Sequence, residues 1–139
     1  MLFRSGVSLA DQVSGDLGAR MHAAFEAGAP TLLAGTDCPS ISATHLRDCA
    51  AALREGSDAV FLPAEDGGYG LVGLAQPHIG IFSNMVWSTA TVMEETRERL
   101  RRLELTWREL ATIWDVDFPE DARRLAESGL LPGWTPPFT

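Results

Sequence analysis

Short apolar runs alternate with segments of helical periodicity along this chain, and this alternation restricts its fold more than any other feature. Residues 31–35 (TLLAG), 58–63 (DAVFLP) and 69–75 (YGLVGLA) are expected to be strands. Strands that alternate with helices favour a three-layer α/β/α sandwich with a mostly parallel sheet. One antiparallel strand is expected near residues 59–75, where two of the runs are joined by a short corner.

The helices are predicted from apolar spacing and from the residues suited to cap them. Asp16, Ser42 and Ser88 are the expected caps of three helices, the last of which runs to about Leu103. A fourth, short helix is expected to begin at Pro119, since proline is favoured in the first turn. Two short strands are expected within residues 103–116.

Composition limits the function classes. The 139 residues suit a single domain, and the formal net charge of −8 is unsuited to a polynucleotide partner. The two cysteines, Cys38 and Cys49, form neither a disulfide framework nor a zinc motif. No apolar run reaches transmembrane length and no secretory leader is evident, so we expect a cytoplasmic protein without membrane partners.

Three acidic or glycine-rich loops are candidates for chemistry, and each has a simpler structural explanation. Asp37 follows an apolar strand, where a carboxylate can hold a hard cation or simply form a loop turn. Asp115 and Asp117 alternate, so both point the same way along an extended segment, although Asp117 also suits a helix N-terminus. Residues 63–71 (PAEDGGYGL) combine acids and glycines, which permits close backbone approach to a ligand or a plain hairpin turn.

Together these loops resemble one family. The motifs QVSGDLGARM, GTDCPSIS, LPAEDGGYGLVGL, WST and DVDFPEDARRL, in this order, resemble the rSAM/selenodomain-associated transferase 1 family of the nucleotide-diphospho-sugar transferase (GT-A) superfamily. The resemblance covers about residues 12–126. It implies a metal-dependent, glycosyltransferase-like enzyme that uses a nucleotide-activated small-molecule donor.

The resemblance also implies roles for individual residues. Asp37 and Asp117 would be the ligands of Mg²⁺ or Mn²⁺. Asp66 is the candidate catalytic base on other grounds, because a hairpin corner over the cleft would place it near an acceptor hydroxyl. The expected cofactor-binding positions are Gly15, Asp16, Leu17, Gly18 and Arg20. The expected substrate-binding positions are Thr36, Cys38, Pro39, Gly67, Gly68, Tyr69, Trp87 and Ser88.

Two departures from the family pattern keep other functions open. The basic, glycine-containing phosphate loop with which members of the family begin is not found, so we expect a truncated GT-A fold over residues 1–139. Phe118 stands where the family has Thr or Ser, which removes a helix cap worth about 1 kcal/mol. A non-catalytic binding or oligomerising module and a nucleotidyltransferase of cofactor synthesis are the alternatives.

Three structural expectations follow. Asp37 and Asp117 should approach each other at the end of the sheet. Gly67 or Gly68 should have a positive φ angle. The truncation should leave the edge of the strand at residues 31–35 open, so we expect a homo-oligomer in which residues 1–4 help to cover that edge.

Overall fold

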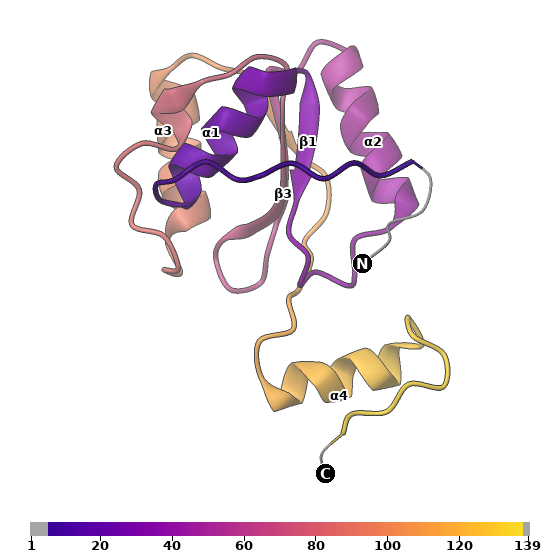
Figure 1. The fold of residues 1–139 in the computed structure, drawn as a ribbon. Helices are drawn as coiled ribbons and strands as arrows, with labels where there is room; N and C mark the ends of the chain where they lie inside the picture. Colours follow the sequence, from indigo (N-terminus) through magenta and orange to yellow (C-terminus); the bar gives the residue numbers. More distant parts are fainter. Residues whose placement is uncertain (1–5, 138–139) are drawn as a thin grey trace.

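In a computed structural model, residues 6–137 form a small sheet with helices on both faces (Figure 1). The helices and strands are, in chain order, α1 (Leu17–Gly28), β1 (Thr31–Ala34), α2 (Ala43–Arg54), β2 (Ala59–Pro63), β3 (Tyr69–Leu74), the 3₁₀ turn η1 (Ile79–Ile81), α3 (Val92–Arg102), β4 (Trp107–Glu109) and α4 (Pro119–Ser128).

The four strands lie in the order β1-β3-β2-β4. β3 is antiparallel to both of its neighbours, whereas β4 is parallel to β2, so three strands run one way and β3 runs the other. The expected α/β architecture with one antiparallel strand in the 59–75 region is therefore confirmed. A short corner joins β2 to β3, which forces the reversal, and β3 then lies between β1 and β2.

Strand alternation divides the core into two parts. Phe61 on β2 packs with Phe25 of α1 and Leu100 of α3 on one face of the sheet. Val60 and Leu62 point to the opposite face, where they pack with Cys49 of α2. Figure 1 shows this arrangement, with α1 and α3 on one side of the sheet and α2 on the other. The predicted three layers are present.

Most predicted helix starts agree with the structure. The Asp16 carboxylate accepts a hydrogen bond from the backbone N–H of Ala19 at 2.8 Å. Ser42 Oγ accepts one from the N–H of His45, and α4 begins at Pro119. At the start of α4, the Asp121 carboxylate accepts hydrogen bonds from the N–H groups of Asp117 and Phe118.

The predicted cap at Ser88 is wrong. Ser88 has a φ angle of +62°, and α3 begins only at Val92, with Thr91 at the cap position. The reason is a tertiary contact that the helical periodicity does not contain. The N–H of Met93 donates a hydrogen bond to the carbonyl of Gly67 at 2.8 Å, so the preceding residues follow the β2–β3 corner.

The region after α3 holds less strand than expected. Only β4 forms within residues 103–116, and Ile113 adds an isolated parallel bridge to Ala64. In the described part of the chain, β1 pairs with β3 alone, so its other edge is open. The homo-oligomer stays a prediction, and the segment 1–4 assigned to its interface lies outside the described residues. Within residues 6–137 no helix is both long and apolar enough to cross a membrane.

Candidate functional site

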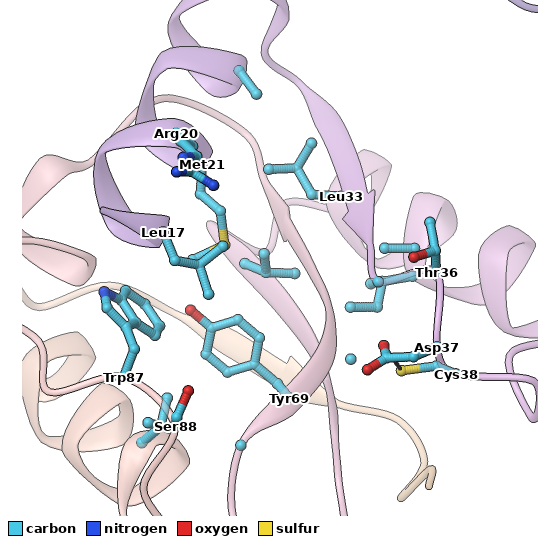
Figure 2. A pocket seen from close by; sticks show the side chains of 18 of the residues that line it. Leu17, Arg20, Met21, Leu33, Thr36, Asp37, Cys38, Tyr69, Trp87 and Ser88 are labelled. Carbon is cyan, nitrogen blue, oxygen red and sulfur yellow. Dashed lines mark hydrogen bonds between the residues drawn. The ribbon is translucent and has the colours of Figure 1, made fainter. Parts of the chain in front are cut away.

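A cavity of about 1140 Å³ opens where the loops predicted to carry chemistry meet. Its wall comes from the segment before α1, from α1 itself, from the end of β1, from the β2–β3 corner and β3, and from residues 87–92 and 115–117. Figure 2 shows the acidic corner at Asp37 on one side of Tyr69 and the side chains of Leu17 and Trp87 on the other. The cavity therefore has an acidic end and an apolar end.

Four carboxylates gather at the acidic end because the three strands of like direction end there. Asp37 follows β1 and Asp66 follows β2, while Asp115 and Asp117 follow β4. One ligand oxygen each from Asp37, Asp115 and Asp117 lies within 4.8 Å of the other two. The expected approach of Asp37 to Asp117 is thus present, and Asp115 lies with them.

Backbone contacts hold these loops together. The N–H of Val116 donates a hydrogen bond to the carbonyl of Asp37 at 3.0 Å, which joins the two acidic loops directly. Both loops rest on β3 at Gly70, where an added Cβ would lie 2.1 Å from Ile113 Cδ1 and 2.7 Å from Cys38 Sγ. A side chain at residue 70 would therefore push the loops apart.

The clustered carboxylates alter the protonation of their neighbours. Burial, together with the charge of Asp66 and a hydrogen bond to it, raises the pKa of Asp115 to about 7, and Asp117 and Asp37 add to the effect. Burial and the neighbouring Asp37 raise the pKa of Cys38 to about 12. Cys38 thus stays a neutral thiol and is unsuited to be a nucleophile at neutral pH.

These residues fit a divalent cation. Three carboxylate oxygens at short mutual distance are the ligand type that hard cations such as Mg²⁺ and Mn²⁺ prefer. Burial and the neighbouring carboxylates together raise the pKa of Asp115, and a cation beside the cluster would oppose this effect. Among the described residues of the cavity wall, Arg20 is the only positively charged side chain, and it is exposed at the rim.

Residues 64–68 form a tight turn at the mouth of the cavity. The N–H of Gly68 donates to the Asp66 carboxylate at 2.9 Å, and the N–H of Ala64 donates to the carbonyl of Gly68 at the same distance. Gly67 has a φ angle of +95°, as predicted for one of the two glycines, whereas Gly68 does not lie in the left-handed region. The turn directs Asp66 toward Asp115.

Two comparisons place the chain among known proteins. Residues 2–89 match the family described as "Uncharacterized protein conserved in bacteria (DUF2064)". The chain belongs to this family. No functionally curated protein matches it.

A solved structure adds the fold superfamily. The chain is similar to a "putative nucleotide-diphospho-sugar transferase" from Desulfovibrio desulfuricans G20, with a TM-score of 0.76 and 30% identity. The alignment covers 88% of this chain and 55% of the Desulfovibrio protein, so the chain spans about half the length of that protein. The nucleotide-diphospho-sugar transferase-like fold is therefore supported by both sequence and structure, while membership of the rSAM-associated subfamily stays a prediction.

Most site residues predicted for this DUF2064 chain lie on the cavity wall. These are Leu17, Arg20, Thr36, Asp37, Cys38, Asp66, Gly68, Tyr69, Trp87, Ser88 and Asp117. Within the described chain, the wall does not include Gly15, Asp16, Gly18, Pro39 or Gly67. Asp16 caps α1, and the carbonyl of Gly67 accepts a hydrogen bond from the N–H of Met93. Both residues therefore affect the site only indirectly.

Sequence reasoning passed over two kinds of residue. Asp115 alternates with Asp117 in the sequence, but the resemblance implies only two ligand positions and Asp115 is not one of them. The alternation is the signal that points to Asp115 as a third ligand, because alternate residues of an extended segment face the same side. Met21 and Leu33 line the apolar end, but they look like ordinary core residues in sequence and nothing distinguishes them there.

Proposed function

We propose that this protein is a metal-dependent, glycosyltransferase-like enzyme that transfers a group from a nucleotide-activated donor. The observation that carries the proposal is the meeting of Asp37, Asp115 and Asp117 beside a cavity large enough for a substrate. Ligands in α/β sheets of this kind bind at the carboxyl ends of the strands, which is where this cluster lies. The similarity to the Desulfovibrio protein supports the same reaction class.

The acidic cluster suits a donor that carries a diphosphate only if a cation accompanies it. Carboxylates repel phosphate oxygens, and Arg20 alone is a weak counterweight among the described residues of the wall. Asp37, Asp115 and Asp117 would hold Mg²⁺ or Mn²⁺. When bound, that cation would neutralise the diphosphate and the charge that develops on it as it leaves.

The remaining residues have distinct proposed tasks. Asp66, held by the N–H of Gly68 at the mouth of the cavity, would accept the proton of an acceptor hydroxyl. Arg20 would meet the outer phosphate oxygens from the α1 side of the cavity. Cys38 supports Asp37 sterically and through a contact of 3.5 Å between Sγ and a carboxylate oxygen.

Calorimetric titration with MnCl₂, followed by UDP, GDP and CDP in its presence, tests the proposal. We expect Asp37→Asn and Asp117→Asn each to weaken Mn²⁺ binding by about 10-fold or more, since each removes a charged ligand. Asp48→Asn is the matched control, because Asp48 is an exposed aspartate on α2 outside the cavity. It should bind Mn²⁺ as the wild type does.

The outcomes separate the competing functions. If Asp37→Asn and Asp117→Asn bind Mn²⁺ as tightly as Asp48→Asn does, the metal site is wrong. If Mn²⁺ and a nucleoside diphosphate bind but no sugar donor is consumed with any acceptor, the alternative of a non-catalytic binding module gains support.

A further inference from the structure

The hydroxyl group of Tyr69 is buried at the apolar end of the cavity without a hydrogen-bond partner among the described residues. Buried polar groups are almost always paired, because leaving one unpaired costs stability. Figure 2 shows that the hydroxyl points away from Asp37, toward Leu17 and Trp87. Burial raises the pKa of Tyr69, so the group stays a neutral hydrogen-bond donor.

The surroundings of this hydroxyl are apolar and partly aromatic. Leu17, Met21, Leu33 and the ring of Trp87 line the same end of the cavity. The Tyr69 ring is fixed from behind by Phe61, with the ring centroids 5.0 Å apart and the planes at 66°. The indole N–H of Trp87 is also buried and finds no partner within residues 6–137.

The wall that carries Trp87 is held in a strained conformation. Ser88 has a φ angle of +62°, which is uncommon for a residue with a side chain. Close contact between the backbones of Ala90 and Gly67, and the hydrogen bond from Met93 to Gly67, tie this loop to the corner. Strain of this kind persists where the surrounding structure imposes it, and it concentrates at functional sites.

We propose that the apolar end of the cavity binds an uncharged planar ring that bears an oxygen acceptor for the Tyr69 hydroxyl. This deepens the proposed function and rests on it in one respect, namely that the ring belongs to a substrate of the transfer reaction. Aromatic walls favour planar ligands through stacked or edge-to-face contacts. The acidic end of the cavity and the net charge of −8 disfavour an anionic ring.

Leu17 is a side chain that can move to admit a ligand to the Tyr69 hydroxyl. It lies beside this hydroxyl in Figure 2, and the residue is 50% exposed. Exposed side chains change rotamer within nanoseconds, so Leu17 can turn aside without disturbing the core. The incoming ring then takes the place of the Leu17 side chain against Trp87.

Two sources supply rings of this chemistry, the nucleobase of the donor and an aromatic acceptor. Uridine represents the first and coumarin the second, since both are uncharged and carry carbonyl acceptors. NMR titration of the metal-free protein with each probe measures binding that does not depend on a cation. Tyr69→Phe removes only the hydroxyl, and Trp134→Phe is a control variant whose indole lies outside the cavity.

For the probe that represents the true source, Tyr69→Phe should weaken binding about 3- to 10-fold, as expected for loss of one hydrogen bond. Trp134→Phe should leave binding unchanged. The thermal midpoint of ligand-free Tyr69→Phe should equal that of the wild type or exceed it by about 3 °C, because the hydroxyl lost has no partner among residues 6–137.

The proposal is overturned if Tyr69→Phe leaves the affinity for both probes unchanged, whichever way its thermal midpoint moves. A weaker affinity for uridine assigns the ring to the donor, and a weaker affinity for coumarin assigns it to the acceptor. Because no metal is present, this result is independent of the Mn²⁺ titration. Failure of the ring site and failure of the metal site can therefore be told apart.

Discussion

Gly67 shows how a single backbone position holds two walls of the cavity together. Its φ angle of +95° suits glycine alone, and a Cβ at this position would lie 2.0 Å from the carbonyl oxygen of Ala90. The neighbouring Gly68 has neither constraint, since the nearest atom to an added Cβ is an Asp66 carboxylate oxygen at 3.4 Å. The two glycines therefore form a matched pair.

Gly67→Ala should lower the free energy of unfolding by more than about 1 kcal/mol, because both the φ angle and the contact with Ala90 oppose a side chain. Gly68→Ala should change it by less than about 0.5 kcal/mol. Urea denaturation of both variants measures the difference. Equal stability of the two variants would show that the corner is not constrained at Gly67.

At the level of residues, sequence reasoning reached those whose chemistry is visible in a short motif. Asp37 and Asp117 were predicted to meet, and one ligand oxygen of each lies within 4.8 Å of the other. The unpaired state of the Tyr69 hydroxyl could not be predicted, because it depends on which side chains from α1 and the 87–92 loop surround it. Local sequence does not specify such contacts.

At the level of elements, local signals worked where local energetics decide the structure. Helix caps at Asp16 and Ser42 and the proline at the start of α4 depend on neighbouring residues only. The start of α3 was misplaced because the hydrogen bond from Met93 to Gly67 is tertiary. The hairpin over residues 59–75 predicts that β3 pairs with β2, whereas its second neighbour, β1, follows from no local signal.

Helix α4 is joined to the corner by a side-chain contact that can be tested alone. The Arg124 guanidinium donates two hydrogen bonds to the Glu65 carboxylate, at 2.8 and 3.0 Å, and lies 4.3 Å from the centroid of the Trp114 ring. Both charged groups are well exposed, so the pair adds little to global stability. These contacts link α4 to the corner that carries Asp66 and to the loop that carries Asp115.

Arg124→Ala should therefore speed amide hydrogen exchange in residues 119–128 while leaving the thermal midpoint almost unchanged. Arg123→Ala is the control, since Arg123 is exposed and makes no ion pair within residues 6–137. Mass spectrometry after deuterium labelling resolves the helix. Identical exchange in the two variants would mean that α4 is held by its buried Ala122 and Leu125 alone.

For the molecule as a whole, negative charge is concentrated where the strands end. The net charge is −8, and four of the aspartates lie together at one end of the cavity. Because of this concentration, we expect the stability of the metal-free protein to depend on pH. Asp115 is the group that reports it, since its pKa is raised from an ordinary 3.8 to about 7.

The sign of this dependence follows from proton linkage. Between about pH 4 and about pH 7 the folded protein holds a proton on the cluster that the unfolded chain has released, so the free energy of unfolding falls as pH rises through this range. Above about pH 7 the cluster is ionised in both the folded and the unfolded protein, so the free energy of unfolding falls no further on this account. Because the carboxylates are coupled, the proton belongs to the cluster around Asp115 as a whole.

Asp115→Asn should abolish most of this fall, because an amide needs no proton to be neutral. In EDTA, the variant should be more stable than the wild type at about pH 8, and the difference should shrink toward about pH 5. Asp48→Asn, on the exposed face of α2, should follow the wild type at every pH. Thermal unfolding across this range is the measurement. Parallel curves for wild type and Asp115→Asn would mean that the cluster tolerates its full charge without a cation, and the argument for a metal at this site would lose its electrostatic basis.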